Sequence, residues 1–324
     1  MNHELLLQLF ENRSGEYVSG ERISQELGVS RTAIWKQIRK LEAAGYQFEA
    51  SRRLGYRLLS TPDHIAVDEL SNRMTTGFFG QTIHYFETVE STQNLARAAA
   101  EEGAAEGTLF IAEQQVSGRG RMGRSWVSPR GKGVWMSMVL RPKVPIHFAP
   151  QLTLLTAVAL CRSLRRLTAL PIGIKWPNDL LIDGKKISGI LLESAAEDER
   201  LRYVVAGIGI SVNLDEADYP ADLLEKATSL RISSGQKWAR EDVIFEFLKE
   251  WEQLYVLYQE QGFGPIVTLW EALSVSLGKP ARLVTPQGDF VGVPIGLDES
   301  GAIRIKLEDG TVRPVFSAEM GEPI

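Results

Sequence analysis

The stretch GRGRMGRSWVSPRGKG, residues 118–133, carries five glycines and five cations. Its context excludes a dinucleotide-binding fold, although part of its pattern matches one. Its first three glycines satisfy G-x-G-x-x-G, which in a dinucleotide-binding fold opens a helix and precedes an acidic residue about twenty positions later. Here the chain runs on through Pro129 into another strand-like segment, and Lys143 stands where the acid is required. A G-x-x-x-x-G-K-[ST] phosphate loop is also missing from the sequence, so an ATP site would be of another kind.

Residues 118–133 are better explained as a loop that binds an anion. Glycines let backbone N–H groups approach a ligand closely, and arginines supply paired donors that match phosphate or carboxylate oxygens. The alternative is an exposed basic loop without a ligand. Because crowding like charges is costly without an anionic partner, we favour the anion-binding interpretation.

A second polar motif, Lys175-Trp176-Pro177-Asn178-Asp179, precedes the segment Lys186-Ile187-Ser188-Gly189. Trp-Pro followed by Asn-Asp predicts a stiff turn that presents Asp179 to a cleft. Lys186 begins an apolar, strand-like run, where a partly desolvated ammonium can face a negative ligand. Gly189 leaves room for a flat ring against the backbone. The alternative is a hairpin with solvated lysines.

A third motif, Glu90-Ser91-Thr92-Gln93-Asn94, begins a helix predicted for residues 91–102. Ser91 is predicted to be the N-cap of this helix, with its hydroxyl bonded to the first turn. Hydroxyls and amides at a helix start can also bind the polar head of a ligand, so a second role stays open.

The amino-terminal part of the chain is basic and the remainder is acidic. The whole chain has a net charge of −5, whereas residues 22–57 hold eight basic residues against three acidic ones. The polar segment Ser60-Thr61-Pro62-Asp63 predicts a linker, because its proline disfavours a helix. We therefore expect a small basic domain at residues 1–62, joined to an acidic body.

The pattern of the basic domain is typical of a winged helix-turn-helix. The predicted elements are a helix at 21–27, a turn at 28–30, a helix at 31–44 and strands at 46–50 and 56–59. In the second helix, the spacing of Ile34, Ile38 and Leu41 predicts a buried stripe. The second helix would then enter the major groove of DNA.

The candidate DNA contacts lie on the exposed face of that helix and at the hairpin tip. Cations there would reach phosphates, and the other groups would reach base edges. The alternative is a basic module that docks on a protein. The candidates are Ser30, Arg31, Thr32, Trp35, Lys36, Arg39, Arg52 and Arg53.

Beyond residue 66 helical and strand-like patterns alternate, which is typical of an α+β domain with a mainly antiparallel or mixed sheet. From Lys279 onward, short strand-like runs are separated by turns about ten residues apart, which predicts a small β-barrel. We expect a central domain over residues 63–275 and a C-terminal domain over 276–324. The fold class is therefore multidomain α+β.

Composition restricts the kind of protein further. Hydrophobic residues make up 44% and charged residues 24% of the chain, which suits globular domains with substantial cores. The single cysteine, Cys161, excludes a disulfide framework and a cysteine zinc site. No metal-ligand spacing links His3, His64, His84 and His147. We see no signal sequence and no membrane-spanning stretch, and we expect a cytoplasmic protein that uses no membrane.

The motifs at residues 118–124, 175–179 and 186–189, in this order behind a winged helix, resemble those of the family of bifunctional biotin protein ligases and biotin operon repressors. The resemblance covers essentially the whole chain. It implies a central domain of the biotin/lipoate ligase type and a C-terminal SH3-like β-barrel. It also implies a biotin–[biotin carboxyl-carrier protein] ligase, which uses ATP and Mg²⁺ to form biotinyl-5′-AMP and then transfers biotin to an acceptor lysine.

The resemblance also implies roles for individual residues, by their match to the family's motifs. Catalytic roles would fall to Arg119, Arg121, Asp179 and Lys186. Biotin would be bound by Ser91, Thr92, Gln93, Gln115, Arg119, Gly120, Arg121, Lys186 and Gly189. The nucleotide would be bound by Arg121, Arg124, Trp126, Asn178, Asp179, Ser211 and Asn213. No metal ligand is assigned.

The second activity that the resemblance implies is regulation. Biotinyl-5′-AMP would act as corepressor, promote a homodimer and direct it to the operator DNA of biotin genes. Two alternatives stay open at this point. One is a non-enzymatic winged-helix repressor that senses a small molecule, and the other is a ligase for lipoate or another acyl acid.

Overall fold

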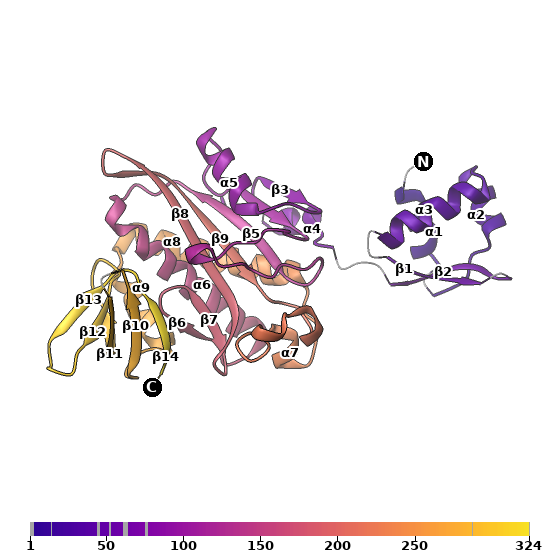
Figure 1. The fold of residues 1–324 in the computed structure, drawn as a ribbon. Coiled ribbons are helices and arrows are strands. Elements are labelled where there is room, and N and C mark those ends of the chain that lie inside the picture. The colour runs from indigo at the N-terminus through magenta and orange to yellow at the C-terminus, as the bar shows by residue number, and fades with distance from the viewer. Residues whose placement is uncertain are drawn as a thin grey trace. The chain divides into compact units, whose positions relative to one another are not determined.

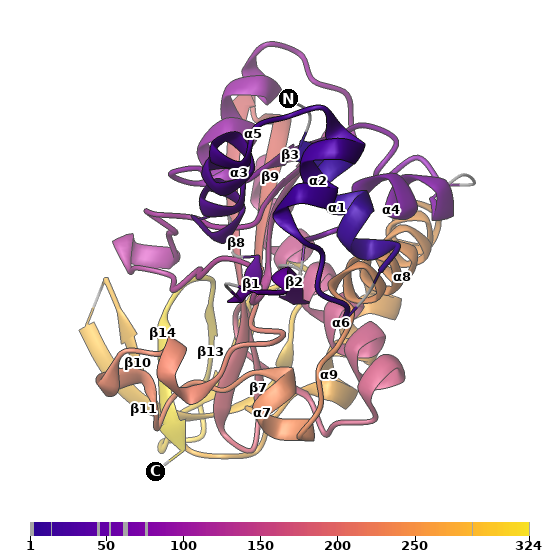
Figure 2. The ribbon, with the colours of Figure 1, turned by 90° about the vertical axis from the view of Figure 1, so that its right-hand side faces the viewer.

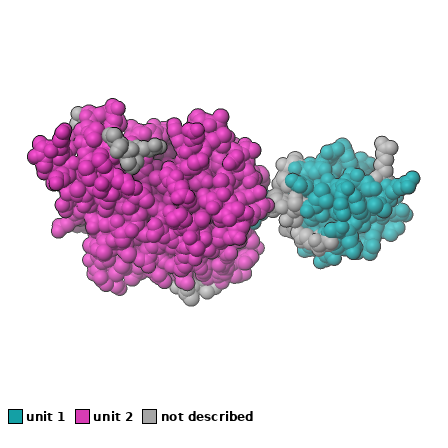
Figure 3. Space-filling model, turned by 90° about the horizontal axis from the view of Figure 1, so that it is seen from below, with its two compact units in different colours: residues 1–64 teal, residues 65–324 magenta. Residues whose placement is uncertain are grey.

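The structure, a computed structural model, describes residues 3–13, 15–43, 46–51, 53–60, 64–74, 77–286 and 288–323 (Figure 1). The chain divides into two compact units, Met1–His64 and Ile65–Ile324, which Figure 3 colours separately. None of the helices within these described ranges is long and apolar enough to cross a membrane.

The first unit consists of three helices and an antiparallel two-stranded hairpin. Its elements are α1 (His3–Glu11), α2 (Gly20–Leu27), α3 (Arg31–Ala43), β1 (Gln47–Ser51) and β2 (Gly55–Ser60). The predicted stripe of α3 is confirmed, because Ile34, Ile38 and Leu41 are buried. Helix α1 is not among the predicted elements, and its Leu6 and Phe10 complete this core.

Short polar signals set the geometry of the helix-turn-helix. The Ser19 hydroxyl accepts a hydrogen bond from the N–H of Arg22 and caps α2. Gly28 ends α2 at a φ of 65°, a left-handed conformation that favours glycine. The Ser30 hydroxyl accepts from the N–H of Ala33 at 3.3 Å, at the start of α3. Of the predicted features, Arg52, the helix end at residue 44 and residues 61–63 of the linker lie outside the described residues, whereas Ser60 of the predicted linker ends β2.

The second unit is built on a seven-stranded sheet in the order β3-β4-β5-β9-β8-β7-β6. The strands are β3 (Ile83–Phe86), β4 (Leu109–Ala112), β5 (Val134–Leu140), β6 (Gly173–Lys175), β7 (Asp179–Ile182), β8 (Lys185–Glu197) and β9 (Arg200–Ile210). Strands β3 and β4 are parallel, and the other neighbouring pairs are antiparallel. The predicted mixed, mainly antiparallel sheet is confirmed.

Helices cover both faces of this sheet (Figures 1 and 2). The α-helices in the described part of this unit are α4 (Val67–Arg73), α5 (Thr92–Glu101), α6 (Ala149–Thr168), α7 (Leu230–Ser234), α8 (Arg240–Gln261) and α9 (Gly264–Leu273). Helix α5 packs on one face, where Ala96 and Ala100 meet Phe110 and Val205. Helices α6, α8 and α9 belong to the main core on the opposite face. Cys161 of α6 is buried in that core.

A smaller antiparallel sheet forms the C-terminal part of the second unit, in the order β13-β12-β11-β10-β14. Its strands are β10 (Ala281–Thr285), β11 (Gly288–Leu297), β12 (Ile303–Lys306), β13 (Val312–Val315) and β14 (Glu319–Pro323). Leu283, Ile303 and Ile305 are fully buried in a core that is continuous with that of the larger sheet. The predicted run of short strands in this part is confirmed, and its closure into a β-barrel stays a prediction.

Candidate active site

The second unit contains a cavity of about 360 Å³ beside the start of α5. This volume lies in the range of small-molecule sites. The walls come from α5, the basic loop at residues 118–133, the turn at 176–179, strands β8 and β9, and the start of β14. Of the residues predicted to bind biotin or the nucleotide, all but Asn213 line this cavity.

One end of the cavity is polar but uncharged. Thr92 donates to Gln115 Oε1 from its N–H at 2.9 Å and from its hydroxyl at 3.1 Å. Gln115 Nε2 in turn donates to the Ser128 hydroxyl at 3.1 Å. These bonds fix amide and hydroxyl groups at the cavity wall, an arrangement suited to an uncharged polar ligand head.

Ser91 occupies the N-cap position of α5, but its hydroxyl makes no capping hydrogen bond. The prediction of a side-chain cap is therefore wrong. Instead, Gln115 from a distant segment accepts from the N–H of Thr92 at this helix start. Ser91 is buried at the cavity wall.

Gln93 lies at the floor of the same end, and both ends of its amide are engaged by the protein. Oε1 accepts from the Ser137 hydroxyl at 3.0 Å, and Nε2 donates to the carbonyl of Val205 at 3.1 Å. Gln93 therefore ties α5 to β5 and β9. In this arrangement its amide shapes the floor instead of reaching toward a ligand.

The basic loop is a folded excursion between β4 and β5. Its two legs are joined by backbone bonds from Gln115 N–H to the carbonyl of Ser128 at 3.3 Å and from Trp126 N–H to that of Gly118 at 2.8 Å. A further bond, 2.7 Å long, runs from the N–H of Gly120 to the carbonyl of Arg124. The loop thereby carries its arginines on an ordered backbone.

Arg121 points to the junction between the turn and the C-terminal sheet. It donates to Asn178 Oδ1 at 3.2 Å and to the Ser317 hydroxyl at 3.1 Å. Burial lowers the pKa of the Arg121 guanidinium, and the charge of nearby Asp179 opposes that shift. An arginine remains charged at neutral pH even so, and Arg121 therefore supplies a positive charge at the cavity wall.

The other two arginines near the loop tip also have polar partners. Arg119 donates to Asn94 in the first turn of α5, and Arg124 pairs with Glu319 of β14. The hydrogen bond from Arg124 lowers the pKa of the Glu319 carboxyl. Both contacts, a hydrogen bond to a neutral amide and an ion pair, lie at exposed side chains, where an ion pair contributes little to stability.

A cation and a carboxylate stand close together at the charged end of the cavity. Lys186 Nζ lies 2.8 Å from Asp179 Oδ1, at the distance of an ion pair but without the alignment of a hydrogen bond. The ammonium also lies 5.1 Å from the centroid of the Trp126 ring, within reach of a cation–π interaction. The neighbouring strands β7 and β8 carry these two charged groups, with Asp179 opposite Gly189.

The indole of Trp126 lies across the backbone of β8 and β9. A Cβ atom at Gly209 would lie 2.4 Å from Trp126 Nε1, so only glycine fits there. The indole N–H is buried and has no acceptor in the part of the chain that the structure describes. A flat ring does lie near Gly189, but here it is the protein's own ring.

The residues predicted to bind the nucleotide divide into two groups. Asn178 lines the cavity, with Nδ2 donating to the carbonyl of Ile190 at 2.8 Å, and Ser211 lines it as well. Asn213 lies outside the cavity. Its amide donates to the carbonyl of Trp238 at 2.8 Å and accepts from the Trp238 N–H at 3.0 Å. A direct nucleotide contact by Asn213 does not agree with this arrangement, because the amide already joins two backbone segments.

Two parts of the wall were not predicted. One follows β9, where the Tyr219 hydroxyl donates to the carbonyl of Thr228 at 2.7 Å and burial raises the pKa of Tyr219 to about 12. The other is the start of β14. No sequence motif marks either part, because most of these side chains carry no reactive group. The unpredicted lining residues of these two parts include Tyr219, Leu223, Lys226, Ala227, Ala318, Glu319 and Met320.

In the first unit, the predicted DNA-binding face of α3 is exposed. The exposed residues are Arg31, Thr32, Trp35, Lys36 and Arg39, and Arg53 of the hairpin is exposed as well. Arg31 lies 3.5 Å from Glu21, and Arg39 lies 3.0 Å from Glu42. The Arg39 guanidinium is also 5.6 Å from the Trp35 ring. The face is therefore basic, with an aromatic ring beside its cations.

Three family models match successive parts of the chain. The HTH domain matches residues 2–57, the Biotin/lipoate A/B protein ligase family matches 85–211, and the Biotin protein ligase C terminal domain matches 276–320. Their order along the chain is that of the winged-helix unit, the larger sheet with the cavity, and the smaller sheet.

Individual relatives agree. The bifunctional ligase/repressor BirA of Bacillus subtilis is 42% identical over 315 residues, which is 97% of each chain. The BirA of Escherichia coli is 27% identical over 97% of this chain and 95% of its own. Among solved structures, a biotin protein ligase from Aquifex aeolicus in complex with biotin and ATP has a TM-score of 0.64 and 30% identity, over 74% of this chain and 98% of that one.

A winged helix-turn-helix unit, followed by a biotin/lipoate-type ligase fold with an arginine-rich loop over its cavity, defines the class of DNA-binding biotin protein ligases. Within this class, the chain belongs to the bifunctional ligase/repressor BirA family.

Proposed function

We propose that this chain activates biotin with ATP, transfers it to a lysine of a biotin carboxyl-carrier protein, and represses biotin genes when the adenylate is bound. The observation that carries the ligase function is the polarity of the cavity. Its wall carries neutral, hydrogen-bonding groups at Thr92 and Gln115 and also positive charges at Arg121 and Lys186. Biotin has the matching form, with a neutral cyclic urea at one end and a carboxylate at the other.

In the first step, a biotin carboxylate oxygen bonds to the α-phosphorus of ATP. The bond from that phosphorus to the bridging oxygen breaks, and pyrophosphate leaves with the electron pair. Because a carboxylate and a polyphosphate repel each other, we assign Arg119, Arg121 and Arg124 to neutralise this approach. Charged donors at such a position stabilise the transition state more than the separated reactants.

In the second step, the neutral amine of the acceptor lysine bonds to the acyl carbon of biotinyl-5′-AMP. The bond from that carbon to the phosphate oxygen breaks, AMP leaves, and the amine loses a proton. We assign Lys186 to polarise the acyl phosphate and Asp179 to orient the amine. The 2.8 Å pair that they form supports this assignment, because both groups reach one point of the cavity wall.

Mg²⁺ belongs to the proposal only as the ion that accompanies ATP. Within the described residues, no group of three His, Cys, Asp or Glu side chains could hold a metal ion. The carboxylates that line the cavity, Asp179 and Glu319, are engaged by Lys186 and Arg124. Magnesium commonly keeps several waters and binds through substrate phosphates, so we assign it no protein cage and no step.

The regulatory part of the proposal uses the first unit. Biotinyl-5′-AMP is the proposed corepressor, and an adenylate-promoted homodimer is the proposed DNA-binding form. Two copies of α3 would then reach two half-sites of an operator. The domain limits that we propose for these roles remain 1–62 for DNA binding, 63–275 for catalysis and 276–324 for the C-terminal domain.

Biotin-dependent exchange of labelled pyrophosphate into ATP tests the ligase function. We expect exchange with biotin that lipoate does not compete away. Arg121→Ala should slow it about a hundredfold to a thousandfold, the usual effect of losing one transition-state donor. Thermal unfolding of the variant should be close to that of the wild type. No exchange by the wild type would leave a non-enzymatic sensor, and effective competition by lipoate would indicate another acyl acid as the substrate.

A further inference from the structure

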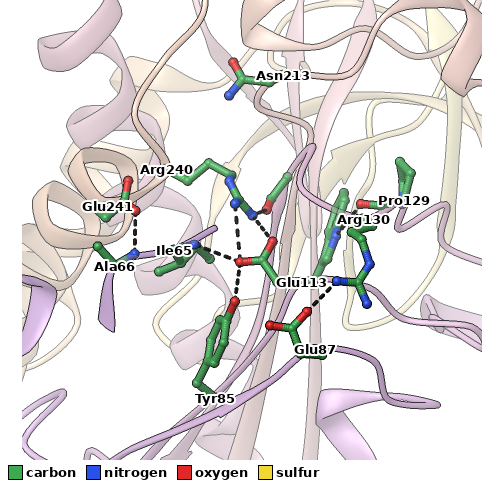
Figure 4. Close-up of polar contacts among 12 residues, drawn as sticks. Ile65, Ala66, Tyr85, Glu87, Glu113, Pro129, Arg130, Asn213, Arg240 and Glu241 are labelled. Atoms are coloured by element: carbon green, nitrogen blue, oxygen red, sulfur yellow. Dashed lines mark hydrogen bonds and ion pairs between the residues drawn. The ribbon is translucent and has the colours of Figure 1, made fainter. Parts of the chain in front are cut away.

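Glu113 and Arg240 form a buried ion pair at the base of the basic loop (Figure 4). Both side chains are 0% exposed, and Arg240 Nη1 lies 2.7 Å from Glu113 Oε2. Neither residue lines the cavity. Burial raises the pKa of the Glu113 carboxyl, but the charge and hydrogen bonds of Arg240 outweigh it, so the pKa stays below its usual value. The carboxylate is therefore ionised at neutral pH.

The same carboxylate receives donors from two more segments. Glu113 Oε1 accepts from the N–H of Ile65 at 2.8 Å and from the Tyr85 hydroxyl at 2.7 Å (Figure 4). Ile65 is the first residue of the second unit, and Tyr85 belongs to β3. One side chain thus joins the point at which the chain enters this unit to the sheet and to α8.

The pair also lies where the two legs of the basic loop meet: Glu113 precedes the loop, and its backbone and the Arg240 side chain contact the end of the loop. The N–H of Gly131 donates to the carbonyl of Glu113 at 3.2 Å, and Arg240 Nη1 donates to the carbonyl of Gly133 at 3.3 Å. Two residues beyond Glu113, Gln115 accepts the bonds from Thr92 at the cavity wall. A rearrangement of the loop over a ligand would therefore act on this pair directly.

The next residues of α8 hold the entry segment further. The Glu241 carboxylate accepts from the N–H of Ala66 at 2.6 Å (Figure 4), and Asp242 pairs with Arg73 of α4 at 2.7 Å. Three consecutive residues of α8, from 240 to 242, thus fix the segment from Ile65 to α4.

A buried ion pair is a poor source of stability, because apolar residues of similar volume often serve as well. What a carboxylate adds is the ability to accept from several segments at once. We propose that Glu113 is a positioning residue that couples ligand binding under the basic loop to the anchoring of Ile65. The inference rests on the proposed function, since biotin and ATP are the ligands proposed to bind under the basic loop. By linkage, a stronger attachment of Ile65 to Glu113 would also strengthen ligand binding.

The test uses the full chain with Glu113→Gln and the matched control Glu250→Gln. The Glu250 side chain is also buried, at 3% exposure, and it pairs with Arg162 at 2.6 Å and Arg166 at 2.7 Å. These contacts join α6 to α8, far in the sequence from the basic loop and from the entry segment. Both variants replace one oxygen of a buried carboxylate, whose two oxygens each contact an arginine nitrogen, by an NH2 group.

Two quantities are measured: hydrogen exchange of the Ile65 and Ala66 amides with and without biotin plus ATP, and the kinetics of pyrophosphate exchange. With ligands, wild type and Glu250→Gln should gain roughly tenfold protection at these amides, within the usual range of coupling between sites, and Glu113→Gln less than about twofold. Glu113→Gln should raise the KM for biotin roughly tenfold and change kcat less than about twofold.

Equal responses of Glu113→Gln and Glu250→Gln in protection and in KM would overturn the inference, because the pair would then be merely structural. A wild type that exchanges pyrophosphate without any change at Ile65 would overturn it as well. A wild type without biotin-dependent exchange would instead overturn the proposed function.

If thermal unfolding shows that Glu113→Gln does not fold, a second variant is available. Tyr85→Phe removes one hydrogen bond to the Glu113 carboxylate and keeps the ion pair. It should reduce the protection gain roughly twofold, and an unchanged gain would contradict the coupling.

Discussion

At the scale of single residues, Gly209 controls the position of the aromatic ring in the cavity. The Trp126 indole packs so closely on the backbone of β9 that a Cβ atom at 209 would overlap its nitrogen. The same ring carries the Lys186 ammonium near its face. The absence of a side chain at Gly209 therefore sets the positions of the Trp126 ring and the Lys186 ammonium. We assign the ring to the nucleotide and the ammonium to the acyl phosphate.

Gly209→Ala should displace Trp126 and with it Lys186. We expect the KM values for biotin and ATP to rise roughly tenfold or more, with a stability loss of about 1–3 kcal/mol from overpacking. Steady-state pyrophosphate exchange and thermal unfolding measure these effects. Gly264→Ala is the matched control, because a Cβ there meets nothing within 4 Å. Unchanged KM values in Gly209→Ala would mean that the ring is not part of the site.

Charged motifs were the residues most easily predicted. One cavity is lined by all four of the predicted catalytic residues, Arg119, Arg121, Asp179 and Lys186. They could be predicted because charged side chains crowded in one short segment usually bind a ligand of opposite charge. Ser91 occupies the predicted N-cap position, but its hydroxyl makes no capping bond, and the acceptor at that helix start, Gln115, comes from another segment. Side-chain partners that are distant in sequence leave no local pattern.

At the scale of elements, α3 has one buried apolar face and one exposed basic face. Ile34 and Ile38 are buried, whereas Arg31, Lys36 and Arg39 are exposed. The exposed ion pairs of this helix, such as that between Arg31 and Glu21, contribute little to stability. Their arginines can therefore exchange a carboxylate for a DNA phosphate at low cost.

Arg31→Ala combined with Lys36→Ala should weaken operator binding and reduce the slope of log K against log salt by roughly 2, one per phosphate contact. Pyrophosphate exchange should be unaffected. A filter-binding or anisotropy titration at several salt concentrations measures the slope. Lys249→Ala with Lys279→Ala removes two exposed charges from the second unit and serves as the control. An unchanged slope in the α3 variant would exclude phosphate contacts by these residues.

Among the elements, regular patterns were predictable and topology was not. The stripe of α3 follows from apolar spacing and occurs as predicted. The order of the large sheet, with β9 between β5 and β8, follows from packing of remote segments. The walls contributed by Tyr219 and by β14 depend on that topology, and for this reason no local signal marked them.

At the scale of the whole molecule, the two units have separate hydrophobic cores. The first is small, and a domain of about 60 residues has a modest stability because it buries a limited fraction of its surface. Damage to that core should therefore remove DNA binding without removing catalysis.

Ile34→Ala should destabilise the first unit by about 2–5 kcal/mol, because it leaves a cavity in a small core. Calorimetry should show a transition for this unit at lower temperature, and pyrophosphate exchange should persist above it. Leu5→Ala, at a position that is 53% exposed in the same unit, is the control and should change little. A single shifted transition with parallel loss of exchange activity would show that the units unfold together.

The strand order of the large sheet also bears on how the protein comes into being. Val134 of β5 pairs with Ile210 of β9, so the floor of the cavity joins segments made at different times during synthesis. Pairing between such remote segments is slow, because a long stretch of chain must first be brought together. A newly made polypeptide accordingly has no binding cavity for biotin until β9 has paired with β5. Added biotin can therefore stabilise only those destabilised variants in which this pairing still forms.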